Sequence, residues 1–140
     1  MKENMEIFTL DNDIKVFCET AISFPEGIMK AHNELQSIVP FSEERRYFGI
    51  SRPNEKGVVI YKAATEEIYQ GEAEELGCET FVIESGQYIS ILIHDYIKDL
   101  QNIVRAFQIL TAHPGIDPEG YCIEFYMNKK DVRCMIRLMN

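Results

Sequence analysis

Hydrophobic positions along this chain follow two spacings, one typical of strands and the other of helices. Apolar residues interleave with polar ones at 14–22, 47–51 and 58–64, which predicts three strands. Between the first two, apolar residues recur at helical spacing and predict a helix that ends at Pro40: Ile28, Ala31, Leu35, Ile38 and Val39. The tetrapeptide at 23–26 has the S-x-x-E form of a capping box, so we expect this helix to begin there.

The second half of the chain repeats this order of elements. Strands are predicted at 80–83 and 87–93, joined at Glu84, Ser85 and Gly86. A helix from 97 to 110 follows, with Asp95 as its candidate N-cap, and then a hairpin of strands 121–127 and 132–138 around a turn at 128–131. Each half therefore reads strand, helix, strand, strand, which predicts an α+β protein with a largely antiparallel sheet.

An acidic segment at 66–77 connects the two halves. It contains a short helical turn that we expect to end at Gly77, and the acidic run 66–75 is most simply a solvated surface. The length of 140 residues and the hydrophobic fraction of 46% fit one globular domain spanning 1–140, and we expect a monomer. The formal net charge of -9 repels phosphate backbones, which argues against direct binding of nucleic acid.

The cysteines have no metal-binding pattern. Cys18, Cys78, Cys122 and Cys134 form no CxxC pair, and no Cys/His cluster has zinc-site spacing, so we expect free thiols and no metal. The N-terminus lacks the apolar run of a secretory signal, and no stretch is long enough to span a bilayer. These observations predict a cytoplasmic protein without a membrane partner. No Gly-rich phosphate loop or hydrolase signature is present, and we assign no cofactor and no catalytic residue.

Alternation along the later strands separates two kinds of side chain. At 121–127 one face is apolar, and the other carries Cys122, Glu124 and Tyr126. At 87–94 the apolar face holds three isoleucines, and the opposite face carries Tyr88, Ser90, Leu92 and His94. We expect the face with Glu124 and the face with Tyr88 to line one concave surface. That surface would carry aromatic rings, one carboxylate and one imidazole, which would suit a pocket.

A structural alternative exists for each of these residues. With a turn at 128–131, Glu124 would face Met135 and lie diagonal to Arg133 and Arg137, so it could pair with an arginine on a solvated face. The tyrosines of the strands could be half-buried core residues, since strands favour aromatic side chains. His32, on the first predicted helix, reads as a surface or boundary residue.

Several stretches resemble the GyrI-like small-molecule-binding domain family. They are RRYFGISRPN, VVIYKAA, FPEGIMKAHNEL and above all EGYCIEFYMNKKDVRCMIRL, so the resemblance covers about 14–138. Members of this family serve as effector-binding parts of multidrug-responsive bacterial transcription regulators and also occur as free-standing proteins. The resemblance implies two strand-helix-strand-strand halves with pseudo-twofold symmetry, two main helices on one face of the sheet, and a ligand pocket between the halves.

The resemblance also implies a site. The family's glutamate in the penultimate strand matches Glu124, which would face a small, lipophilic and possibly cationic ligand. Tyr126, Tyr61, Phe48 and His94 complete the set of expected ligand-binding residues. The chain has no Trp, which some members use to stack ligands, and no helix-turn-helix.

Two other functions stay open at this stage. A small hydrolase could use Glu124 with Tyr61 or Tyr126 to activate water. A protein-interaction module of the topoisomerase-inhibitor type is the second alternative, and the acidic surface would suit it.

Overall fold

The protein is represented by a computed structural model that describes residues 4–139. The chain divides into two compact units, each with its own antiparallel sheet and helix. Unit 2 is the continuous stretch 13–84. Unit 1 combines the residues up to 12 with those from 85 onward. The α+β class and the antiparallel pairing predicted from the sequence are confirmed.

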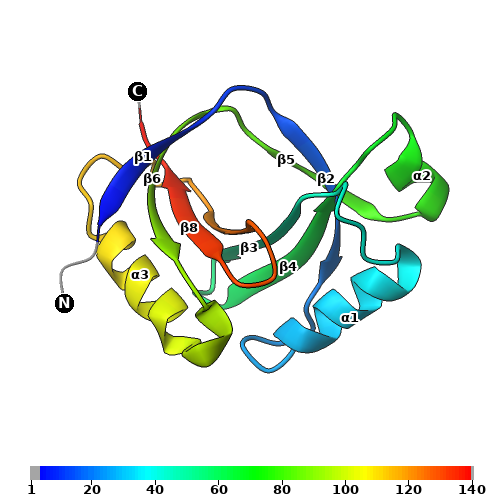
Figure 1. Cartoon of the computed structure of the whole chain (residues 1–140), viewed down its shortest axis with the longest axis horizontal. Coiled ribbons are helices and arrows are strands. Elements are labelled where there is room, and N and C mark those ends of the chain that lie inside the picture. The colour runs from blue at the N-terminus through cyan, green and yellow to red at the C-terminus, as the bar shows by residue number, and fades with distance from the viewer. Residues whose placement is uncertain (1–3, 140) are drawn as a thin grey trace. The chain divides into compact units, whose positions relative to one another are not determined.

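Unit 2 is a four-stranded sheet covered on one face by a helix (Figure 1). The strands follow the order β3-β4-β2-β5. Phe17, Ala63 and Tyr61 of the sheet pack against Ala31 and Leu35 of the helix α1. The elements are β2 (Ile14–Thr20), α1 (Ile28–Ile38), β3 (Tyr47–Pro53), β4 (Val59–Glu66), α2 (Glu72–Leu76) and β5 (Glu79–Ile83).

Unit 1 has the same arrangement of strands around one helix. Its order is β1-β6-β8-β7, and α3 covers the face that carries Ile89, Ile91, Ile93, Val132 and Cys134. The elements are β1 (Met5–Leu10), β6 (Gly86–Ile93), the 3-10 turn η1 (Tyr96–Lys98), α3 (Gln101–Thr111), β7 (Cys122–Tyr126) and β8 (Val132–Arg137).

The edge strands correct the predicted topology. The stretches 80–83 and 87–93 do not form a hairpin, because β5 pairs with β2 in unit 2 and β6 pairs with β1 and β8 in unit 1. The strand β1 was not predicted at all. Each unit thus gains a fourth strand, so the predicted three-stranded halves are incomplete.

Both faces of each sheet are buried, so alternation alone does not identify a solvent face. In unit 2 the face away from α1 is apolar and no more than 2% exposed at Val16, Cys18, Phe48, Ile50, Ala64 and Ile83. In unit 1 the face away from α3 is buried at Tyr88, Ser90, Ile123, Phe125 and Met135. None of the helices in residues 4–139 has the length and apolar character needed to cross a bilayer.

Both helices begin later than predicted. The helix α1 starts at Ile28, and Ser23 does not cap it; instead the Ser23 carbonyl accepts a hydrogen bond from the Gly27 N–H at 3.1 Å. A Cβ at Gly27 would lie 2.7 Å from that carbonyl, so this turn requires glycine. The helix α3 starts at Gln101, whose N–H bonds to Asp99 Oδ1, and Asp95 precedes η1 without a side-chain cap.

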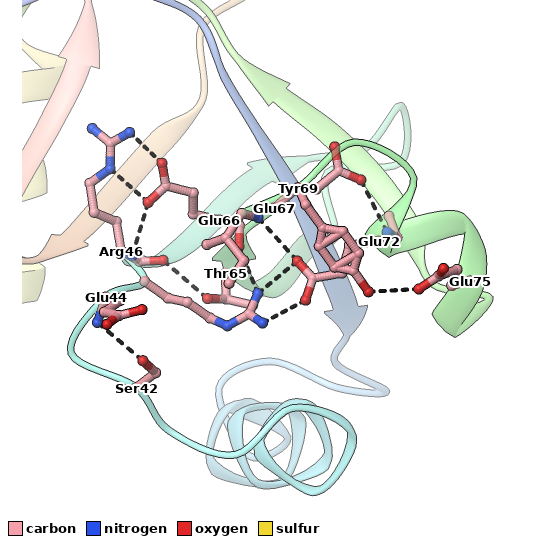
Figure 2. A network of polar contacts seen from close by, with 12 residues as sticks. Ser42, Glu44, Arg46, Thr65, Glu66, Glu67, Tyr69, Glu72 and Glu75 are labelled. Carbon is pink, nitrogen blue, oxygen red and sulfur yellow. Dashed lines mark hydrogen bonds and ion pairs between the residues drawn. The ribbon is translucent and has the colours of Figure 1, made fainter.

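A buried ion pair fixes the acidic segment 66–77, which lies within unit 2 and does not connect the units as predicted. Arg45 donates to both carboxylate oxygens of Glu72, at 2.8 and 2.5 Å, and their side chains are 9% and 5% exposed (Figure 2). Arg45 also donates to the Glu66 carbonyl, and Glu72 accepts from the Ile68 N–H. The acidic run 66–75 is therefore not simply a solvated surface: Glu72 anchors α2, which ends at Gly77 as predicted.

We expect Glu72→Gln to destabilise the protein by roughly 3–5 kcal/mol, because it leaves Arg45 buried without a counter-charge. The free energy of unfolding from urea titration measures this. Arg45 holds the pKa of Glu72 below its ordinary value of 4.5, so the contribution is present above that pH and is lost as the pH falls through the folded-state pKa.

Glu66→Gln is the matched control. Its partner Arg46 is 44% exposed, so removing this pair should cost less than about 1 kcal/mol. Equal losses in the two variants would contradict the anchoring role of Glu72.

Candidate ligand-binding site

The register of the last hairpin decides which face Glu124 occupies. The hairpin closes with a hydrogen bond from the Met127 N–H to the Asp131 carbonyl, so the loop is 128–130, one residue shorter than predicted. The Asn128 side chain supports this loop by accepting from the N–H groups of Lys130 and Asp131. Glu124 consequently lies opposite Cys134 and not opposite Met135.

This register overturns the arginine alternative for Glu124. Arg133 lies opposite Phe125, and Arg137 has the same parity, so both occupy the face away from Glu124. Arg133 Nη1 donates to Glu6 Oε1 at 2.7 Å and to Ser90 Oγ at 3.0 Å, and Arg137 donates to the Ser85 carbonyl. The predicted diagonal pairing is therefore wrong.

The expected grouping of Glu124 with Tyr88 is also wrong. Tyr88 pairs with Arg137 and shares its face, whereas Glu124 lies on the face of the β6 isoleucines. The error arose because the strands at 87–94 and 121–127 each have one strongly apolar face, and these two faces were assumed to coincide. The structure instead places them on opposite sides of the unit 1 sheet.

Glu124 lies half-buried on the face covered by α3. Its neighbours on the strand, Cys122 and Tyr126, both pack against the core cluster that includes α3. The Tyr126 hydroxyl donates to Glu124 Oε1 at 2.5 Å. The ring of Tyr96, from η1, lies 5.6 Å from the ring of Tyr126, centroid to centroid. We call Glu124, Tyr126 and Tyr96 the Glu124 cluster.

The charge of Glu124 affects three surrounding groups. Burial raises the pKa of Tyr96, and the Glu124 carboxylate raises it further. The same two causes, in the same order, raise the pKa of the Cys122 thiol to about 11 and raise the pKa of the Cys134 thiol. A carboxylate whose field reaches buried neighbours in this way disfavours further negative charge and favours a cation.

Tyr96 was missed by the sequence analysis. Its position depends on a hydrogen bond from its N–H to the carbonyl of Lys130, which ties η1 to the loop of the last hairpin. Nothing in the local pattern around 96 indicates that contact. The adjacency of Glu124 and Tyr126, in contrast, follows from their spacing of two along a strand.

Of the other expected site residues, His94 belongs to unit 1, and Phe48 and Tyr61 belong to unit 2. His94, 72% exposed, lies just beyond β6 with its Nδ1 3.2 Å from Asp131 Oδ1. Phe48 is fully buried on β3, and Tyr61 is 1% exposed on β4. Phe48 pairs with Ala64 and Ser51 pairs with Tyr61, so the two aromatic residues lie on opposite faces of the unit 2 sheet.

Tyr61 has its own polar and aromatic neighbours. Its hydroxyl lies 2.8 Å from His32 Nε2, and the ring of Phe24 stacks on it at a centroid distance of 6.1 Å. Burial lowers the pKa of His32 to about 4, so this imidazole is neutral at physiological pH. His32 is thus a boundary residue bonded to the core. Across the described residues 4–139, no three His, Cys, Asp or Glu side chains are placed to hold a metal ion.

No family model and no curated protein matches the sequence. Solved structures nevertheless share the fold. The integron cassette protein VCH_CASS2 of Vibrio cholerae is similar with a TM-score of 0.72 at 12% identity, over 96% of this chain and 95% of that chain. SAV2435, solved bound to tetraphenylphosphonium, has a TM-score of 0.62 at 8% identity, over 98% and 94% of the two chains.

A hydrolase from Listeria innocua is also similar, with a TM-score of 0.59 at 7% identity over 99% of this chain and 93% of that chain. At these identities the likeness is one of fold. The fold thus occurs in a structure with a bound small molecule and in a hydrolase.

The effect of Glu124 on Cys122 can be measured directly. We expect Glu124→Gln to speed alkylation of Cys122 by iodoacetamide at pH 9, because loss of the carboxylate lowers the thiol pKa and raises the thiolate fraction. Mass spectrometry of the labelled peptides gives the rate at each cysteine. Cys18, in unit 2, is an internal control, since burial is the main cause that raises its pKa to about 12 and Glu124 is not among the causes. An unchanged Cys122 rate would show that the carboxylate does not face this thiol.

Proposed function

We propose that the protein binds a lipophilic organic cation at the Glu124 cluster of unit 1. The observation that carries the proposal is a half-buried carboxylate on the α3 face of the sheet, which accepts a hydrogen bond from Tyr126, whose ring lies beside that of Tyr96. The GyrI-like resemblance supports it, because the family's ligand-facing glutamate matches Glu124. The bound tetraphenylphosphonium of SAV2435, a protein of the same fold, also supports this class of ligand.

The energetics favour a large cation with delocalised charge. Two unit charges 4 Å apart attract by about 4 kcal/mol at the effective dielectric constant of a protein surface. A ring face adds roughly 0.5–2 kcal/mol of cation–π attraction. A lipophilic cation loses little hydration on entry, so most of this attraction remains as affinity, whereas a small hydrated cation would lose it to desolvation.

Tyr126 has a defined part in this proposal. Its hydroxyl donates to Glu124 Oε1, which fixes the carboxylate beside the ring without neutralising it. One side chain thus orients the charge and supplies an aromatic surface next to it. Tyr96 adds a second ring from a different segment of unit 1.

We expect Glu124→Gln to weaken tetraphenylphosphonium binding by about tenfold or more, which is 1.4 kcal/mol or more. Isothermal titration calorimetry gives the dissociation constants. Glu55→Gln is the matched control, since it removes one charge from the exposed β3–β4 turn and should leave the affinity unchanged. Triphenylphosphine oxide, a neutral compound of similar shape, should bind the wild type weakly. Equal affinity of wild type and Glu124→Gln for the cation would refute the proposal.

Hydrolysis is the second candidate function, and the Tyr126–Glu124 contact favours it. A tyrosine hydroxyl 2.5 Å from a carboxylate can pass a proton, and the pair could activate water. The likeness to the Listeria innocua hydrolase adds fold-level support. Mass analysis of small strained electrophiles incubated with wild type and Tyr126→Phe distinguishes the two functions: product that forms only with the wild type favours turnover over binding.

A further inference from the structure

The face of the unit 1 sheet opposite the Glu124 cluster carries two arginines, and Arg133 is the one that lies among apolar side chains. Arg133 on β8 lies opposite Leu92 of β6 and Phe125 of β7. Its side chain is 12% exposed, and its guanidinium carbon lies 4.8 Å from the centroid of the Phe8 ring. Phe8 in turn meets Phe125 edge to face at 6.1 Å. One ring therefore lies against the guanidinium, and a second ring packs edge to face on the first.

Only part of this guanidinium is used by neighbouring acceptors. Nη1 donates to Glu6 Oε1 at 2.7 Å and to Ser90 Oγ at 3.0 Å. Nε is buried and has no acceptor within residues 4–139. An arginine offers Nε and the adjacent Nη2 as a planar fork, so one edge of Arg133 is engaged by Glu6 and Ser90 while the Nε edge lacks its acceptor.

A buried N–H of a charged group without an acceptor is destabilising, because the hydrogen bonds it made to water are lost and none replaces them. An acceptor that reaches Nε would recover this energy. The geometry of the fork matches a carboxylate, whose two oxygens accept in parallel from Nε and Nη2. The rings of Phe8 and Phe125 would contact the apolar body attached to such a carboxylate.

The charge of the surroundings selects among anions. Glu6 already places one carboxylate on the guanidinium, and the whole chain carries a formal net charge of -9. A dianionic phosphate would meet about twice the repulsion that a monoanion meets from Glu6. Glu6 is 56% exposed, so solvent screens its charge.

From these observations we propose that Arg133 forms a binding site for a small monocarboxylate with an apolar body. The site lies on the face of unit 1 opposite Glu124, so it is separate from the proposed cation site. It was not expected from the sequence, in which Arg133 was considered only as a partner for Glu124. The Glu6 carboxylate already bonds to the Arg133 guanidinium, so it competes with the ligand carboxylate for that positive charge.

Benzoate is the probe that tests this site. In nitrogen-15 NMR spectra, titration with benzoate should move the Arg133 Nε–H resonance saturably, because that N–H gains an acceptor. The resonance is assigned by its absence in Arg133→Lys. Arg133→Lys should bind benzoate about tenfold or more weakly, since lysine lacks the fork. Glu6→Gln should tighten binding severalfold, because it removes the nearest like charge.

Three controls keep the outcomes distinct. Arg105→Gln removes an exposed arginine that bonds to Asp99 and Asn102, and it should not change benzoate binding. Benzamide, the neutral analogue, should leave the Nε–H resonance in place. Tetraphenylphosphonium affinity should be the same in wild type and Arg133→Lys, so failure of one site does not imply failure of the other.

The proposal is overturned if benzoate leaves the Arg133 Nε–H resonance unmoved, or if inorganic phosphate binds there more tightly than benzoate. It is also overturned if Glu6→Gln weakens benzoate binding. Should Arg133→Lys fail to fold, calorimetric comparison of benzoate affinity in the wild type and Glu6→Gln still decides the matter.

Discussion

One backbone hydrogen bond, from Met127 to Asp131, determines the chemistry of unit 1. It closes the last hairpin with a three-residue loop and so fixes the register of β7 against β8. A shift of one residue would exchange the faces of every side chain on the strand. In the observed register Glu124 lies on the α3 side of the sheet and Arg133 on the other side. The sheet therefore separates a carboxylate and a guanidinium that are close in sequence. In our two proposals, each of these charged groups binds a ligand of opposite charge.

In both units, buried side chains lie on the helix face of the strands and also on the opposite face. Tyr61, Phe48, Tyr88 and Phe125 are all buried, although they lie on different faces. Polar side chains that are buried among them need hydrogen-bonding partners. Tyr126 is the partner of Glu124, His32 of Tyr61, and Arg45 of Glu72. Arg133 is the exception among them, because one of its buried donors has no acceptor in the described part of the chain.

Local patterns predicted the elements better than their partners. The helical spacing of apolar residues gave both long helices, and the turn-rich segments gave both hairpins, since these signals lie within a dozen residues. The pairing of β1 with β6 and of β5 with β2 depends on contacts across the chain, which no local pattern encodes. For the same reason the sequence predicted that Glu124 and Tyr126 are neighbours but did not predict that Tyr96 joins them. The loop of the last hairpin is one residue shorter than predicted, so Glu124 has other cross-strand neighbours than expected.

The pairing of β1 with β6, which follows the whole of unit 2 in the sequence, has a consequence for synthesis on the ribosome. Unit 2 is continuous, so all of it is available before β6 has been made, whereas β1 emerges first and has its partner only after the whole of unit 2. Domains fold as their segments emerge, N-terminal parts first. During that interval β1 is an unpaired strand with apolar side chains, and Met5 and Ile7 remain 46% and 53% exposed even after pairing. The strand β1 is therefore open to incorrect pairing until β6 has been made.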